Sequence, residues 1–79
     1  MLYKLKVYDL VSNKVIDVKR IFASGQRIAV KKYIRKYRPE FKKAGVLVMN
    51  EKSKRVYEYA LEKSFNGSET IIDLKRVGK

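Results

Sequence analysis

LYKLKVYD (residues 2–9) and VIDVKRIF (residues 15–22) alternate apolar and polar side chains at the start of the chain. A period of two is the pattern of a β-strand with one buried face. Ser12 and Asn13 lie between the two stretches and suit a two-residue turn. The two stretches therefore predict a β-hairpin at the beginning of the fold.

A turn at Ser12 and Asn13 would also fix which residues of the hairpin oppose one another. It sets Val7 against Val18 and Leu5 against Arg20. One face is then apolar apart from Arg20 and holds Tyr3, Leu5, Val7, Ile16, Val18 and Phe22. The other face holds Lys4, Lys6, Tyr8, Asp17, Lys19 and Ile21.

The segment from Gly25 to Arg38 predicts one amphipathic helix. Its apolar residues recur at nearly helical spacing, at Ile28, Val30, Tyr33, Ile34 and Tyr37. Ser24 is the predicted N-cap, because its hydroxyl can accept a bond from a free N–H of the first turn. Pro39 disfavours helical backbone at the residue before it, so we expect the helix to end at Arg38.

Three further strands are predicted after the helix. VLVM (residues 46–49) is a short apolar strand, and residues 50–54 form a polar turn into the alternating RVYEYAL (residues 55–61). Asn66 and Gly67 both tolerate positive φ and predict a turn into TIIDLKRV (residues 70–77).

That last turn would place Leu61 against Ile72 and Tyr59 against Leu74. An alternative is a helix through VYEYALEKSF (residues 56–65), capped by Ser53 and closed by Gly67. The tyrosines and valine of this segment favour the strand.

Together these elements predict a single α+β domain over residues 1–79. The expected order is β-β-α-β-β-β, with one amphipathic helix packed on one face of a small antiparallel sheet of about five strands.

The composition is strongly basic, with 20 Lys and Arg against 8 Asp and Glu and a net charge of +12. Residues 1–43 hold 13 of the basic and 3 of the acidic side chains. An excess of this size favours a polyanionic partner, because charges of one sign attract such partners at long range. The excess lies mainly in the first half of the chain.

Several classes of protein are disfavoured by missing residues. The chain has no cysteine and no histidine, which removes disulfides, thiolate sites and the commonest metal ligands and general bases. No signal peptide or long apolar run is evident in the sequence. We expect a soluble intracellular (cytoplasmic) protein with no catalytic residues, metal or cofactor.

The sharpest functional pattern is a run of cations in and after the predicted helix, with no acidic residue among the helical ones. Such charged faces ordinarily mix both signs, because like charges three or four positions apart repel. We therefore expect this run to bind nucleic acid, DNA or RNA, through phosphate contacts. Its members are Arg27, Lys31, Lys32, Arg35, Lys36, Arg38, Lys42 and Lys43.

A secondary candidate surface lies on the basic face of the first hairpin. Lys4, Lys6, Tyr8 and Lys19 would combine positive charge with one aromatic ring, as single-stranded nucleic acids favour. Tyr33 borders the helical cations and could also stack on a base.

Two other functions remain open. The basic face could meet an acidic protein, which would make the chain a protein-interaction module. A small metal-independent ribonuclease of toxin type could use Arg and Lys to stabilise phosphate charge and Tyr or Glu to move protons. A homodimer is a further expectation, because a second copy would enlarge a core that so short a chain barely supplies.

Overall fold

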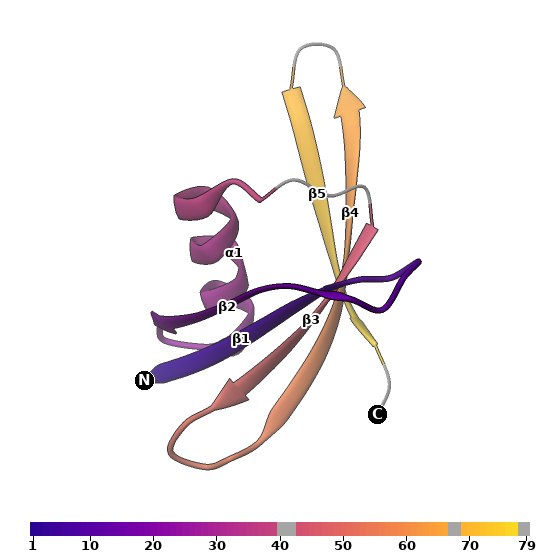
Figure 1. Ribbon diagram of the computed structural model, residues 1–79. Coiled ribbons are helices and arrows are strands. Elements are labelled where there is room, and N and C mark those ends of the chain that lie inside the picture. The colour runs from indigo at the N-terminus through magenta and orange to yellow at the C-terminus, as the bar shows by residue number, and fades with distance from the viewer. Residues whose placement is uncertain (40–42, 67–68, 78–79) are drawn as a thin grey trace.

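The computed structural model describes residues 1–39, 43–66 and 69–77, and describes side chains as far as residue 62. Its elements, in chain order, are β1 (Leu2–Asp9), β2 (Val15–Phe22), α1 (Gln26–Tyr37), β3 (Lys43–Asn50), β4 (Val56–Asn66) and β5 (Glu69–Val77). The strands form an antiparallel sheet in the order β2-β1-β3-β4-β5 (Figure 1). The prediction of a small α+β fold with one helix on an antiparallel sheet is confirmed.

The helix covers one face of the sheet over β2, β1 and β3, and no described helix or strand covers the other face (Figure 1). Buried side chains from both layers meet between them. The helix contributes Ala29, Val30 and Tyr33, and the sheet contributes Tyr3, Leu5, Val7, Ile21, Ala44, Val46, Val48, Tyr59 and Leu61. Burial of this apolar surface is the main stabilising term of the fold.

The predicted register of the first hairpin is wrong by one residue. Val7 pairs with Asp17 rather than with Val18, and Leu5 pairs with Lys19 rather than with Arg20. A slip of one position moves every side chain of a strand to the opposite face. Ile21 therefore lies in the core, whereas Val18 and Phe22 are exposed, Phe22 by 71%.

The cause is a loop longer than two residues, with Asn13 in the left-handed conformation at φ 61°. The N–H of Asp9 donates to Lys14 O at 2.9 Å, and the Asp9 carboxylate accepts bonds from the N–H groups of Val11 and Ser12. A bulge next to Val7 then restores pairing at Tyr8 and Val15. An aspartate side chain that bonds backbone N–H groups two residues ahead is a common turn device.

The turn between β3 and β4 repeats this arrangement. Asn50 takes the place of Asp9, and its side-chain oxygen accepts bonds from the N–H groups of Lys52 and Ser53. Lys54 has φ 64°, like Asn13 in the first turn. The two hairpins therefore share one turn design with an Asx residue at its start.

The helix begins and ends one residue inside the predicted limits. Its N-cap is Gly25 and not Ser24, and no side chain caps the first turn. At the other end Arg38 adopts φ 46° and donates its N–H to Ile34 O at 2.9 Å. Pro39 follows this left-handed residue, in agreement with its predicted role in stopping the helix.

The segment that could have been a helix, residues 56–65, is a strand. Tyr57, Tyr59 and Leu61 point to the side of the sheet that carries the helix, where Tyr59 is 3% and Leu61 1% exposed. Leu61 pairs with Leu74, two positions beyond the predicted partner Ile72. A shift of two residues leaves the faces of a strand unchanged.

Candidate nucleic-acid interface

The helical cations divide into two rows. Residues four apart lie on the same side of a helix, so Arg27, Lys31 and Arg35 form one row on the side away from the sheet. Arg38 follows this row at the C-cap. We call Arg27, Lys31, Arg35 and Arg38 the helix ridge. All four side chains are exposed.

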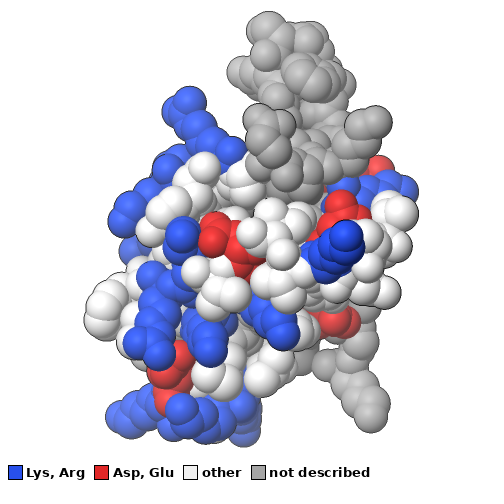
Figure 2. Space-filling model, viewed as in Figure 1, with Lys and Arg blue, Asp and Glu red and all other residues white. Residues whose placement is uncertain are grey.

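The second row consists of Lys32 and Lys36, which face the edge strand β2. Lys32 Nζ donates to Phe22 O at 3.1 Å, and Lys36 Nζ lies 5.4 Å from the centre of the Tyr37 ring. Figure 2 shows Lys and Arg gathered along the side of the molecule where α1 lies in Figure 1. The helical cations thus gather on one side of the molecule and form two rows there.

Four of these helical cations lack a carboxylate partner among the described side chains. Lys31, Lys32, Arg35 and Lys36 form no ion pair with any residue in the described ranges. The ion pairs seen on the sheet include Lys19 with Asp17 at 3.3 Å and Lys43 with Glu62 at 4.0 Å. The described side chains therefore do not compensate the repulsion among these four cations. Binding of an anionic ligand would relieve it.

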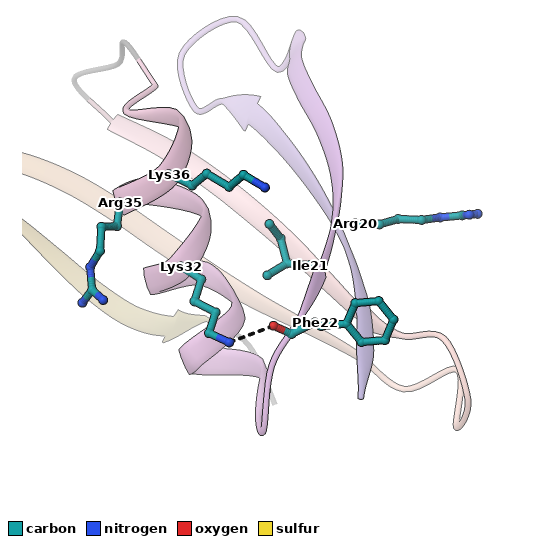
Figure 3. A pocket seen from close by; sticks show the side chains of 6 residues that line it. All are labelled: Arg20, Ile21, Phe22, Lys32, Arg35 and Lys36. Atoms are coloured by element: carbon teal, nitrogen blue, oxygen red, sulfur yellow. Dashed lines mark hydrogen bonds between the residues drawn. The ribbon is translucent and has the colours of Figure 1, made fainter.

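A groove of about 440 Å³ separates the second row from β2 (Figure 3). In Figure 3, Lys32 and Lys36 reach towards the strand and Ile21 points towards the helix. The side chains of Arg20 and Phe22 project from the far side of β2, and Arg35 turns away from it. The residues that line the groove include no carboxylate; they are Arg20, Ile21, Phe22, Lys32, Arg35 and Lys36.

The predicted extension of the run beyond the helix is only partly described. Lys42 lies outside the described residues. Lys43 is the first residue of β3 rather than part of a helical extension, and it is exposed. Its ammonium group faces Glu62, so it does not add an unpaired charge to the surface of α1.

The secondary candidate face is not assembled as predicted, because of the register slip. Lys4, Lys6 and Tyr8 do lie on the open face of the sheet, but Lys19 lies on the helical side. There Lys19 pairs with Asp17 and sits 5.1 Å from the centre of the Tyr37 ring.

Arg20 lies on the open face instead, directly opposite Lys4, and Val18 takes the position opposite Lys6 that had been predicted for Lys19. The Arg20 guanidinium lies 3.8 Å from Glu51. The open face therefore mixes both signs of charge, which makes it a weaker candidate for a polyanion than α1.

Tyr33 is a core residue and does not reach a ligand, contrary to the stacking role considered for it. It is 0% exposed, and its hydroxyl donates to Asp17 Oδ2 at 3.1 Å. Burial and the Asp17 carboxylate raise the pKa of Tyr33 well above its ordinary value. Burial opposes ionisation of Asp17, but bonds from Lys19, Tyr33 and the Val18 N–H outweigh it and lower the pKa of Asp17.

Tyr8 crosses the open face above Gly45. A Cβ atom at Gly45 would lie 2.1 Å from the Tyr8 ring, so glycine is required for this approach. The Tyr8 hydroxyl donates to Glu58 Oε2 at 2.6 Å, which joins β1 to β4 across β3. Burial and the adjacent Glu58 carboxylate raise the pKa of Tyr8 to about 12.

Stability should fall at alkaline pH as Tyr8 ionises. A pKa of about 12 in the folded state against 10.0 for a free tyrosine means that the stabilisation is complete below pH 10 and is lost towards pH 12. Urea unfolding across this range should show a smaller loss for Tyr8→Phe than for the wild type. Equal losses in Tyr8→Phe and the wild type would contradict this assignment.

No metal site emerges in the described part of the chain, where no group of three or more Asp and Glu residues gathers. The described helix is also too short and too polar to cross a membrane. The basic surface of α1 is therefore the most distinctive chemical feature of the described residues.

In comparisons with known proteins, no family model, curated protein or solved structure matches the chain.

Proposed function

We propose that the protein binds nucleic acid without sequence specificity, and that the helix ridge contacts the phosphate backbone. The observation that carries the proposal is the lack of acidic partners for the exposed cations of α1. The first turn of α1 has no acidic residue, and Lys31 and Arg35 form no ion pair within the described ranges. Each phosphate that Lys or Arg neutralises releases condensed counterions, which supplies affinity independent of sequence.

The geometry of the ridge favours backbone contact over the recognition of bases. Three of its cations recur at intervals of four residues on one side of α1, about 6 Å apart along the axis. This spacing is close to the separation of successive phosphates along one strand. Base recognition needs amide or guanidinium groups that enter a groove. Gln26 is the only amide side chain of α1, and its guanidinium groups belong to Arg27 and Arg35 of the ridge, so the preference for backbone contact rests on the spacing of the cations.

The same surface is poorly equipped for catalysis. The groove beside the ridge offers cations that could hold a phosphate, but its lining residues include no carboxylate, and the sequence has no histidine. An ordinary general base is therefore missing from the groove. This supports a binding protein over the toxin-type ribonuclease, which incubation with structured and unstructured RNA in the absence of metal would test.

The decisive variant removes three ridge charges together, as Arg27→Gln, Lys31→Gln and Arg35→Gln. We expect its affinity for a labelled oligonucleotide to fall by about tenfold or more, because phosphate contacts are lost. Fluorescence anisotropy measures the affinity, and circular dichroism checks that the fold is retained.

The matched control removes the same number of charges from the turn between β3 and β4, as Lys52→Gln, Lys54→Gln and Arg55→Gln. These side chains are exposed and lie outside α1. Their loss should weaken binding much less than loss of the ridge. Equal losses in the two triple variants would mean that net charge, and not the ridge, attracts the nucleic acid.

A further inference from the structure

The edge strand β2 presents unused backbone groups to the groove beside α1. Met1 and Ala23 exchange two hydrogen bonds, of 2.9 and 3.0 Å, at the end of the β1-β2 ladder. Bonded and non-bonded pairs alternate along an antiparallel ladder. The pairs formed by Phe22, Arg20 and Val18 are therefore non-bonded, and their N–H and C=O groups point away from β1.

Two of these outward groups are already capped by side chains. The Val18 N–H donates to Asp17 Oδ1 at 2.9 Å, and Phe22 O accepts from Lys32 Nζ at 3.1 Å. Four groups remain between the two caps: the C=O of Val18, both groups of Arg20 and the N–H of Phe22. These groups alternate between acceptors and donors along β2, so they can form backbone hydrogen bonds with one more strand.

Cationic and apolar side chains flank this open edge on both sides of the sheet. On the helical side lie Ile21, Lys32 and Lys36, and on the other side lie Arg20 and Phe22 (Figure 3). A strand added to β2 would project alternate side chains to the two sides. The helical side offers the ammonium groups of Lys32 and Lys36, and the other side offers the exposed ring of Phe22.

We infer that the groove between β2 and α1 binds an extended acidic peptide, which adds to the sheet beside Val18–Phe22. Backbone bonds to Arg20 and Phe22 would hold the peptide in register, as in other cases of strand addition. Carboxylates on its helical side meet the ammonium groups of Lys32 and Lys36. Apolar side chains on its other side cover Phe22, which is 71% exposed.

The charges select this occupant over a second copy of the chain. An edge-to-edge dimer through β2 would bring Arg20, Lys32 and Lys36 of each copy towards the same residues of the other, and like charges in apposition are destabilising. The backbone groups in turn favour a peptide over nucleic acid, because alternating N–H and C=O groups pair with another peptide backbone. This inference goes beyond the proposed function and uses the groove rather than the ridge.

The test compares three labelled peptides of about eight residues. The first peptide alternates Val and Glu, and the second alternates Val and Lys. The third has the sequence of the first, with N-methyl groups on alternate peptide nitrogens, so that one edge of the extended peptide has no N–H groups. By fluorescence anisotropy we expect the Glu peptide to bind and the Lys peptide not to bind. N-methylation keeps the charge but removes strand pairing, so it should weaken binding about tenfold or more.

Variants at Phe22 report on the backbone of the protein itself. Phe22→Pro removes the outward N–H without changing net charge, and Phe22→Ala removes the same ring but keeps the N–H. The proline variant should bind the Glu peptide more weakly than the alanine variant. If the proline variant does not fold, the comparison of methylated and unmethylated peptides decides.

Three outcomes would overturn the inference. Equal affinity for the methylated and unmethylated Glu peptides would mean attraction by charge alone. A dimer of the free protein that Phe22→Pro dissociates, measured by analytical ultracentrifugation, would identify a second copy as the occupant of the edge. Nucleic-acid affinity that falls more in Lys32→Gln, Lys36→Gln than in the ridge variant would assign the groove to nucleic acid.

Failure of the inference and failure of the proposed function give different results. The ridge variant should lose nucleic-acid affinity, whereas its affinity for the Glu peptide should fall less than it does on N-methylation of the peptide. If the protein binds the Glu peptide in the expected way but binds no nucleic acid, the inference about the groove stands and the proposed function of the ridge is wrong.

Discussion

Replacing Tyr33 with alanine is expected to destabilise the fold by about 3–5 kcal/mol, the usual range for loss of a fully buried aromatic side chain. The Tyr33 ring is 0% exposed and fills the space between α1 and the sheet. For a domain of this size such a loss is comparable with a large part of the total stability. Urea unfolding followed by circular dichroism measures it.

Two related variants separate the ring of Tyr33 from its hydroxyl. Tyr33→Phe keeps the ring and removes the bond to the Asp17 carboxylate, so we expect a loss of about 1.5–3 kcal/mol, the usual range for a bond to a charged group. Tyr37→Ala truncates a tyrosine of the same helix that is 40% exposed, and its cost should be well below that of Tyr33→Ala. Similar costs for Tyr33→Ala and Tyr37→Ala would contradict the packing described for α1.

Replacing Gly45 with alanine is expected to destabilise the fold by about 1–3 kcal/mol, the usual cost of forcing an extra group into a filled space. The new Cβ would lie 2.1 Å from the Tyr8 ring, which must move and lose its bond to Glu58. Gly25→Ala is the matched control, because nothing lies within 4 Å of a Cβ atom at Gly25. Gly25 is the N-cap of α1, where alanine is less favourable than glycine, so Gly25→Ala should cost less than Gly45→Ala, at about 1 kcal/mol or below.

The contact with Tyr8 can be tested directly by combining substitutions. In the Tyr8→Ala background the space above Gly45 is vacant, so Gly45→Ala should cost much less than it does in the wild type. A cost for Gly45→Ala that is unchanged by Tyr8→Ala would show that the penalty arises elsewhere in the backbone.

The sequence predicts the helix and the strands because their periodicity is strong, but it does not predict the register of the first hairpin. Ser12 and Asn13 suggested a short turn, whereas the side chain of Asp9 builds a longer one. The recurrence of an Asx residue three positions before a serine, at Asp9 and Asn50, was the signal that could have set the register. Its consequence is large, since it exchanges Ile21 and Phe22 between the core and the surface.

The candidate site is predictable only in part for the same reason. The cations of α1 follow from helical periodicity, and the structure gathers them on one surface. The division of that surface into a ridge and a groove depends on where β2 lies relative to α1, which is a tertiary fact. The exposed ring of Phe22 and the open edge at Arg20 follow from the register, so they become predictable only once the Asp9 turn is recognised.

The most direct test of the central claim is the salt dependence of binding to a labelled DNA duplex. If the four cations of the helix ridge each contact a phosphate, the logarithm of the association constant should fall with the logarithm of salt concentration at a slope of about −4. The ridge variant should show a slope shallower by about 3. No measurable binding to duplex DNA, single-stranded DNA or RNA at about 50 mM salt would contradict the claim, because this attraction is strongest at low salt.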